Sequence, residues 1–348
     1  MKKLIVPVAF LFLIPGFHAA ERKWTPLPAP LSNNAVAAAK VDKKLVVFSF
    51  MGIGPQKTWN EISNRALGLD TETGKWSELR PVPGPSGRLG SAAVTVKDVI
   101  YLLGGYTVDG RGDESSVRSV EMLLPSKGIW YRGADMPVPL DDFVAGVYRD
   151  RYIYTVSGWS GDKAVPIVQV YDAEKDKWRQ ATPIPGTPVF GHAGGLVDDT
   201  IVYCDGAYKN PSATSPKYLA CDECWQGKID HHDIAKIEWS KLPNHPGSGR
   251  YRIAAGSSES DRKIYFAGGT NNAYNFDGIG YDGHPSEPSP VTFVFNLRSN
   301  KWEVIHEKTP NPTMDNRGLL VTSHGLITIG GMEAGQKVTS KINVIPRK

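Results

Sequence analysis

Polar side chains recur at the entry to six short segments that are rich in small residues. The segments read AVAAA, GSAAV, VAGVY, HAGGL, RIAAG and GLLVT. The polar residues at their starts are Asn33, Asn34, Arg88, Asp141, Asp142, His192, Arg250, Arg252, Asn316 and Arg317. Guanidinium groups grip carboxylates through two parallel hydrogen bonds, and histidine exchanges protons near neutral pH. If the six segments meet around one axis, these residues predict a site for a carboxylated ligand.

Each residue type suggests a role in such a site. The predicted substrate-binding residues from this set are Arg88, Arg250, Arg252, Arg317 and Asn34, and the predicted acids or bases are His192 and Asp142. Glu333, in "GGMEAGQK", is a further candidate acid or base. The alternative for each arginine is a structural bond to strand-end carbonyls or to a neighbouring repeat, and for His192 a purely structural imidazole.

A second candidate region is the long segment "TNNAYNFDGIGYDGHPSEPSP". Its chemically useful side chains are Tyr274, Asn275, Asp277, Tyr281, Asp282 and Glu287. Aromatic faces mixed with amides and carboxylates suit a sugar, whose C–H faces stack and whose hydroxyls need donors and acceptors. The alternative is a glycine-rich loop that only covers the fold.

Two sequence markers repeat in phase along the chain and must position these residues. Tryptophans recur at positions 24, 76, 130, 178, 239 and 302, in contexts such as "GKWSELRPVP" and "DKWRQATPIP". After 28 to 30 residues each is followed by a β-rich segment that ends in glycine, at Gly52, Gly105, Gly158, Gly206, Gly269 and Gly331. Internal repeats of about 50 residues indicate stacked or radial repeat folds.

Each repeat contains four short strand patterns separated by polar turns, and helical periodicity of any length is absent. Because one small sheet cannot bury both faces, the sheets must pack radially. The chain ends without a last tryptophan strand, whereas "ERKWTPLPAP" near the start supplies one. We therefore predict an all-β, six-bladed β-propeller over residues 21–348, closed by pairing of the N- and C-terminal strands. The links between blades and the loops between second and third strands should share one face.

The first 20 residues, "MKKLIVPVAFLFLIPGFHAA", are typical of a secretory signal, which predicts a periplasmic or secreted protein. No other apolar run is long enough to span a membrane. Without Lys2 and Lys3 the chain has 38 basic and 36 acidic residues, a balance that argues against nucleic-acid binding. Self-association into a homo-oligomer is left open.

Three cysteines, Cys204, Cys221 and Cys224, allow at most one disulfide, and the sequence does not indicate the pairing. "CDEC" followed by His231 and His232 has a faint resemblance to a zinc site. However, the alternation in "KYLACDECW" places Cys221 and Trp225 on one face and Cys224 on the other, so no metal site is predicted. "RGD" at residues 111–113 is interpreted as incidental.

The glycine pairs and spaced tryptophans resemble the kelch repeat over essentially all of residues 21–348, with degenerate pairs in "MG", "SG" and "DG". Among exported bacterial kelch proteins, the chain resembles the N-acetylneuraminate epimerase (sialic acid mutarotase) family. The resemblance rests on the signal, the six blades, "LITIGGMEAGQKVTSKI" and "FAGGTNNAYN". It implies cofactor-free interconversion of the anomers of a carboxylated sugar by general acid–base ring opening.

One stretch departs from that family. A glutamate is expected directly after the glycine that ends the second strand of the fourth blade, with an arginine shortly beyond. Here "CDGAYKNPSATSPKY" has Ala207 at the glutamate position and Lys217 as the nearest cation. Either Glu333, Asp142 or Glu287 takes the acid–base role, or the ligand differs. The second function class is a non-enzymatic propeller that binds a glycan or a protein partner.

Overall fold

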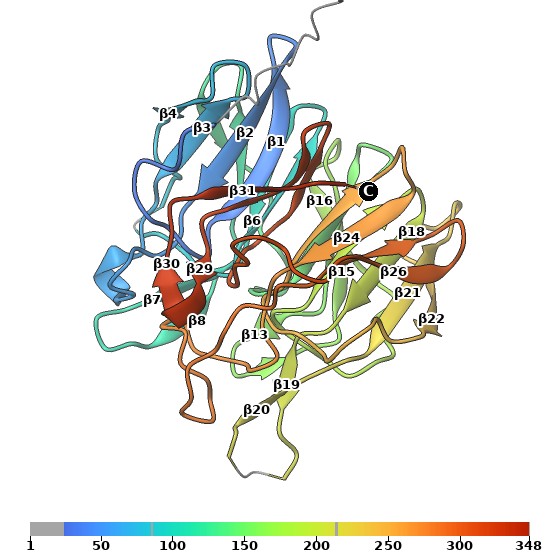
Figure 1. Cartoon of the computed structure of the whole chain (residues 1–348). Helices are drawn as coiled ribbons and strands as arrows, with labels where there is room; N and C mark the ends of the chain where they lie inside the picture. Colours follow the sequence, from blue (N-terminus) through green and yellow to red (C-terminus); the bar gives the residue numbers. More distant parts are fainter. Residues whose placement is uncertain (1–23, 85, 213–214, 348) are drawn as a thin grey trace, which may run out of the picture.

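The computed structural model describes residues 24–84, 86–212 and 215–347. Their strands form six blades around a central channel (Figure 1). Blade 1 contains β1 (Ala35–Val41), β2 (Lys44–Phe50), β3 (Ala66–Asp70) and β4 (Lys75–Glu78). Blade 2 contains β5 (Ala92–Val96), β6 (Val99–Leu103), β9 (Val120–Leu124) and β10 (Ile129–Arg132). Blade 3 contains β11 (Val144–Tyr148), β12 (Tyr152–Val156), β15 (Val168–Asp172) and β16 (Lys177–Ala181).

The second half of the chain repeats the arrangement. Blade 4 contains β17 (Ala193–Val197), β18 (Thr200–Cys204), β21 (Cys224–Ile229) and β22 (Ile237–Leu242). Blade 5 contains β23 (Ala254–Ser258), β24 (Lys263–Ala267), β25 (Thr292–Asn296) and β26 (Lys301–His306). Blade 6 contains β27 (Leu320–Thr322), β28 (Gly325–Ile329) and β31 (Ile342–Ile345). The predicted six-bladed, all-β fold is confirmed.

The innermost strand of each blade is the predicted small-residue segment. These strands contact one another in sequence around the axis, and β27 contacts β1, so the ring is closed. Small side chains allow this crowding: a Cβ at Gly256, for example, would lie 2.0 Å from the Leu319 carbonyl oxygen of the next blade. The apolar core lies between adjacent blades, as where Cys204 and Val202 of blade 4 pack with Phe266 and Phe293 of blade 5.

Five of the repeated tryptophans tie their blade to the preceding one. Their indole Nε1–H donates to a backbone carbonyl in the previous link, in the pairs Trp76–Thr25, Trp130–Arg80, Trp178–Ala134, Trp239–Thr182 and Trp302–Pro243. The distances from Nε1 to the carbonyl oxygen are 2.8–3.3 Å. These tryptophans are therefore scaffold.

Trp24 does not follow this pattern, although its sequence context predicts that it should. Its Nε1 donates to the Thr71 carbonyl of blade 1. The N–H of Leu27 donates to the Ser340 carbonyl, the contact that Val82 makes with Asn64 six residues after its tryptophan. Leu27 is only three residues after Trp24, so the true counterpart of the tryptophan strand precedes residue 24, outside the described residues. The two ends of the chain do meet, but the described part of blade 6 has three strands.

Hairpins extend several blades on one face (Figure 1). They are β7–β8 (Tyr106–Val108, Glu114–Ser116), β13–β14 (Trp159–Ser160, Lys163–Ala164), β19–β20 (Ala207–Lys209, Tyr218–Ala220) and β29–β30 (Met332–Glu333, Lys337–Val338). Short 3₁₀ turns η1 (Trp59–Glu61) and η2 (Ala334–Gln336) lie in the corresponding loops of blades 1 and 6. These hairpins, the blade 5 loop and the inter-blade links form what we call the loop face. The prediction that both loop sets share one face is confirmed.

Six residues in the left-handed backbone region line the axis where the links reach this face. This axial ring consists of Asn33, Gly90, Asp142, Gly191, Arg252 and Asp315, with φ between 47° and 65°. The N–H of Asp142 donates to the Gly90 carbonyl, that of Gly191 to Asp142, and that of Arg252 to Gly191. The residue before each ring position pairs with the residue after the glycine that ends the second strand, as in Leu89 with Tyr106. Equivalent positions of the repeat thus converge on one polar ring.

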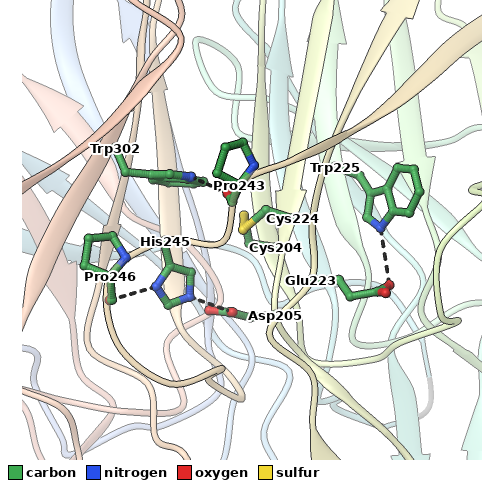
Figure 2. The surroundings of a disulfide bond; sticks show 9 residues. All are labelled: Cys204, Asp205, Glu223, Cys224, Trp225, Pro243, His245, Pro246 and Trp302. Atoms are coloured by element: carbon green, nitrogen blue, oxygen red, sulfur yellow. Dashed lines mark hydrogen bonds and ion pairs between the residues drawn. A yellow bond between two sulfur atoms is a disulfide. The ribbon is translucent and has the colours of Figure 1, made fainter.

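Cys204 and Cys224 form a disulfide between the adjacent strands β18 and β21 (Figure 2). Cys221 is a free, buried thiol. Cys221 packs with Trp225 in one apolar cluster and Cys224 in another, so the predicted division between two faces is confirmed. Among the described residues no helix is long and apolar enough to cross a membrane. The predicted signal segment, residues 1–20, lies outside the described residues.

Candidate functional site

A pocket of about 310 Å³ opens on the loop face above the axial ring. Hairpins β7–β8, β13–β14 and β19–β20 and the blade 5 loop supply its walls, and the ring supplies its floor. Its lining residues are Tyr106, Gly112, Asp113, Glu114, Asp141, Asp142, Trp159, Phe190, Lys217, Tyr218, Tyr251, Arg252, Asn275, Phe276 and Tyr281. We call this the loop-face pocket.

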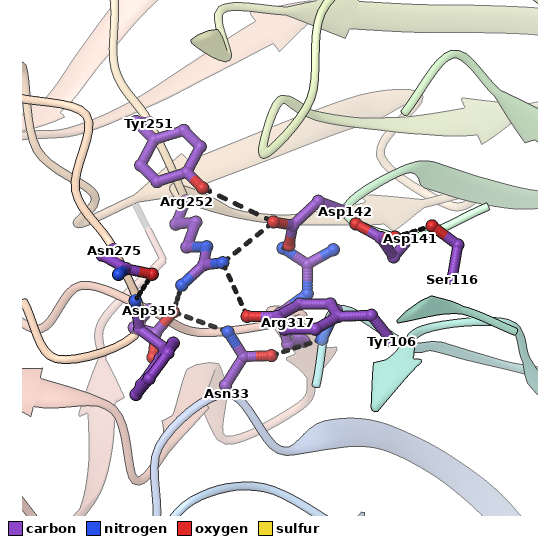
Figure 3. A network of polar contacts seen from close by, with 12 residues as sticks. Asn33, Tyr106, Ser116, Asp141, Asp142, Tyr251, Arg252, Asn275, Asp315 and Arg317 are labelled. Atoms are coloured by element: carbon purple, nitrogen blue, oxygen red, sulfur yellow. Dashed lines mark hydrogen bonds and ion pairs between the residues drawn. The ribbon is translucent and has the colours of Figure 1, made fainter. Parts of the chain in front are cut away.

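Arg252 lies at the centre of the floor and is bound on both sides by carboxylates (Figure 3). Its Nη1 donates to Asp315 Oδ1 and its Nη2 to Asp142 Oδ2, both at 2.9 Å. Nη2 also lies 3.3 Å from the Tyr106 hydroxyl. Because the side chain is 4% exposed, burial would lower its pKa, but the nearby carboxylates raise that pKa well above its usual value. Arg252 is therefore a permanently charged element of the floor.

Asp142 is held ionised by two arginines. Arg317 Nη1 lies 2.8 Å from Asp142 Oδ1, opposite the contact with Arg252. Burial alone would raise the pKa of Asp142, but the two guanidinium charges outweigh it and lower that pKa. Asp315 is bound in the same way by Arg252, by the Asn33 amide at 2.7 Å and by the Ser32 hydroxyl at 2.7 Å. Two arginines and two aspartates thus form a charge-balanced network.

Asp141, the neighbour of Asp142, has the opposite titration. Burial and the negative charge of Asp142 raise the pKa of Asp141 well above its ordinary value, although the Ser116 hydroxyl donates to its Oδ2 at 2.6 Å. Burial also raises the pKa of Glu114, against the influence of Arg252. One pocket therefore holds an ionised aspartate beside a carboxyl group that retains its proton, a combination typical of acid–base sites.

Aromatic rings form a continuous wall of the pocket. The Tyr218 ring lies 4.6 Å from Tyr281 and 5.2 Å from Phe190, and the Trp159 ring lies 5.0 Å from Phe190, all edge to face. Lys217 lies at the rim with its Nζ 5.1 Å from the Tyr218 ring centre. Within the described residues Lys217 makes no ion pair with a carboxylate. The pocket thus combines apolar ring surface with carboxyl, hydroxyl and ammonium groups.

The four predicted arginines divide into two pairs. Arg252 and Arg317 meet at Asp142, as described above. Arg88 instead binds Ser119 and, at 2.6 Å, Glu121 inside blade 2. Arg250 donates to the Val291 carbonyl at 3.1 Å and lies over the Phe293 ring. The structure therefore places Arg88 and Arg250 in the structural role named as their alternative, and the predicted cluster of four arginines does not form.

His192 faces the central channel rather than the loop-face pocket. Its Nε2 donates to the Val156 carbonyl at 2.9 Å. Burial lowers its pKa to about 4, so the ring is neutral at physiological pH. Asn34 is also turned into the protein, where its amide donates to the Ser49 hydroxyl at 2.8 Å. Neither side chain lines the pocket.

The predicted residues of the blade 5 loop are also divided. Asn275 and Tyr281 line the pocket, and Tyr274 is fully buried behind Tyr251, with its ring 5.4 Å from the Arg252 guanidinium. Asp277 accepts from the Ile279 N–H within a turn.

Two predicted acids lie outside the pocket. Glu287 accepts hydrogen bonds from the Gly335 N–H and the Gln336 amide and so joins the loops of blades 5 and 6. Glu333 forms a 2.6 Å ion pair with Lys341. Of the predicted acids and bases, only Asp142 lies in the loop-face pocket.

Sequence reasoning did not select several pocket residues. Asp315 immediately precedes Asn316 and occupies the ring position of Asp142, so aligning the six links on their left-handed residue would have found it. Glu114 and Tyr106 belong to a hairpin that was interpreted as an acidic loop containing an incidental "RGD". Tyr251 lies between two selected arginines. The alternation of the strand patterns alone does not reveal which of these side chains points inward.

Ala207, at the position where a glutamate was expected, is fully buried in β19 and packs with Phe190. The pocket therefore has no carboxylate from that position, and Lys217 lies at its rim. Across the described ranges no cluster of three His, Cys, Asp or Glu side chains suits a metal ion. Cys224 is in the disulfide, and His231 instead contacts Asp199 at 3.1 Å.

The fold and site define a six-bladed propeller with an acid-bearing, aromatic pocket at one end of its channel. A model of the kelch motif matches residues 87–137, which include blade 2. Kelch-like protein 15 of Danio rerio is 30% identical over 238 residues, which cover 68% of this chain and 37% of that protein. Kelch-like protein 15 of Mus musculus is 23% identical over 247 residues, with the same coverage. Kelch-like protein terF of Aspergillus terreus is 29% identical over 240 residues, which cover 64% of this chain and 50% of that protein.

The solved structure of YjhT superposes with a TM-score of 0.72 at 18% identity, covering 93% of this chain and 97% of that one. At this identity the likeness concerns the fold alone. This chain is a kelch-repeat propeller, and it spans 37% of the length of Kelch-like protein 15.

Proposed function

We propose that this kelch propeller binds a sugar in the loop-face pocket and interconverts its anomers by general acid–base catalysis. The observation that supports this most directly is the carboxyl pair on the floor: the pKa of Asp141 is raised and that of its neighbour Asp142 is lowered. Environments that separate the pKa values of neighbouring acids divide the acid and base roles between them.

The walls suit a sugar as a ligand. Pyranose rings present C–H faces that pack on aromatic side chains, here Trp159, Tyr218 and Tyr281. Their hydroxyls need both donors and acceptors, which Asn275 and the carboxyl groups supply. The volume of about 310 Å³ lies at the lower end of the usual range for small-molecule pockets.

The chemistry requires one proton donor and one proton acceptor. Asp141, protonated, gives its proton to the ring oxygen while Glu114, whose raised pKa makes it a stronger base, removes the proton of the anomeric hydroxyl. The bond between the anomeric carbon and the ring oxygen breaks, and a carbonyl forms at the anomeric carbon. Rotation and the reverse transfers close the other anomer. No cofactor or redox step is needed.

A carboxylated sugar is the first substrate to test, and N-acetylneuraminate is the example that the sequence resemblance suggests. Arg252 and Arg317 are already paired with aspartates, so Lys217 is the cation that would meet the carboxylate. The proposal includes a periplasmic or secreted location, which the Cys204–Cys224 disulfide supports because disulfides persist in oxidising compartments.

The test is one-dimensional NMR of freshly dissolved α-N-acetylneuraminate with micromolar protein. We expect faster anomeric exchange than in buffer, and a rate reduced roughly 10²-fold or more by Asp141→Asn and by Glu114→Gln. Glu78→Gln is the matched control, since Glu78 lies on the exposed side of blade 1. Sugar line broadening without faster exchange would replace catalysis by simple glycan binding, and neither effect would reject this sugar as a ligand.

A further inference from the structure

A second cavity, of about 390 Å³, lies in the central channel between the six inner strands. Its walls are mostly backbone and the side chains of alanine, glycine and valine, such as Ala93, Ala145 and Gly256. Within the described residues it shares no lining residue with the loop-face pocket. The network of Asp142, Arg252 and Arg317 separates the two spaces (Figure 3).

His192 gives this cavity a hydrogen-bond acceptor. The residue is 4% exposed and lines the cavity. Because Nε2 is the atom that donates to the Val156 carbonyl, the neutral ring carries its proton there and Nδ1 is a bare acceptor. No described protein group hydrogen-bonds to Nδ1. Buried acceptors in folded proteins are rarely left in this condition.

Arg317 gives the same end of the cavity a donor. Its side chain is 5% exposed, and its Nη1 is engaged by Asp142. Its Nε–H has no partner among the described residues. The charge of Arg317 is already balanced, because Arg252 and Arg317 face Asp142 and Asp315. An additional charged group here would upset that balance, whereas a neutral group would not.

We propose that the channel is a second ligand site, which takes a small neutral polyol from the face opposite the loop face. One ligand hydroxyl donates to His192 Nδ1 and accepts from Arg317 Nε, since a hydroxyl is both donor and acceptor. The carbon chain of the ligand packs on the alanine methyl groups of the wall. Entry is from the end that Glu259 lines, because the ion pairs close the other end. This site is independent of the proposed function.

Occupancy of the channel would be felt in the loop-face pocket. Arg317 lines the channel and binds Asp142, which lines the pocket. A ligand that fixes Arg317 therefore fixes Asp142, and by linkage a ligand in the pocket changes the affinity of the channel by the same factor.

The experiment is a titration of the full chain, labelled with ¹³C-methyl alanine, with erythritol as the probe. We expect saturable shifts of methyl signals from the inner strands. His192→Phe, which removes the acceptor, and Ala145→Leu, which fills the cavity but keeps His192, should each weaken binding at least tenfold. Retention of the folded spectrum shows that either variant is intact, and having two variants covers a failure of one to fold.

Asp141→Asn is the matched control, because Asp141 lines the pocket and not the channel. Unchanged erythritol binding in this variant supports the proposal. Shifts that grow linearly with erythritol, shifts that survive both channel variants, or binding that Asp141→Asn removes would each overturn it. None of these outcomes depends on whether a sugar is turned over in the pocket.

Discussion

His192 and His245 lie in successive inter-blade links, and each is 4% exposed, yet they are held in opposite protonation states. His192, at the axis, meets a backbone carbonyl and is neutral, with its pKa lowered to about 4. His245, between blades 4 and 5, meets the Asp205 carboxylate at 2.7 Å, and this contact raises its pKa although burial opposes it. Burial is the same, so the neighbouring group decides the charge.

The surroundings of His245 are those of a structural ion pair (Figure 2). Its Nδ1 donates to the Pro246 carbonyl at 3.0 Å, and its ring stacks on Phe293 at 4.3 Å and lies against Trp302. Asp205 directly follows a disulfide cysteine. No described cavity reaches this pair. The axial network, in contrast, has a cavity on each side, and we infer that the same kind of buried charge is structural between blades and functional at the axis.

Asp142→Ala should have the largest effect, because it leaves two buried arginines facing one remaining carboxylate. We expect a loss of about 3–5 kcal/mol in the free energy of unfolding, measured by urea denaturation. Glu78→Gln, which breaks an exposed pair with Arg65, should cost no more than about 0.5 kcal/mol. Equal effects of the two variants would mean that the axial network is not specially stabilising.

His192 should make the protein less stable in acid. Since its folded pKa is depressed from 6.5 to about 4, the unfolded chain binds a proton in this window and the folded chain does not. Its contribution, about 3 kcal/mol, is present above pH 6.5 and is lost as the pH falls to about 4. Urea unfolding of wild type and His192→Phe across pH 4–7 measures it as the difference in slope. Parallel slopes would refute the assignment of a neutral His192.

His245 should act in the opposite direction and by a smaller amount. A raised folded pKa gives stability that is complete below the unfolded value of about 6.5 and is lost as the pH rises through the folded pKa. Asp205→Asn removes the carboxylate, should cost about 2 kcal/mol near neutral pH, and should abolish the decline above pH 6.5. A decline that persists in the variant would show that another group is responsible.

The repeat in the sequence predicted the architecture because every repeat has the same structural task. Glycines such as Gly105 and Gly158 take positive φ at the point where the second strand meets the link, and the small segments occupy the crowded axis. Trp24 was an exception: its local context matches the other tryptophans, but the shortened link after it places it against blade 1. Spacing along the chain was a better guide than the residue type alone.

The candidate site was only partly predictable. Asp142, Arg252, Arg317, Asn275 and Tyr281 lie in or at the loop-face pocket as expected. The members of the pair Arg250 and Arg252 differ by two residues, yet one binds carbonyls inside a blade and the other binds two aspartates at the axis. The left-handed backbone of Arg252 redirects its side chain, and the printed sequence carries no mark of that turn.

The sequence by itself determined the number of blades, the order of their strands and the face on which polar residues gather, because these follow from a repeated pattern of glycine, small and apolar residues. It did not determine which carboxyl group keeps its proton, which arginine is free, or that two cavities flank one network. Those properties depend on partners contributed by different blades, such as Asp142 with Arg317 and Asp315 with Asn33. Electrostatic energies fall with distance and rise with burial, so they exist only once the ring has closed.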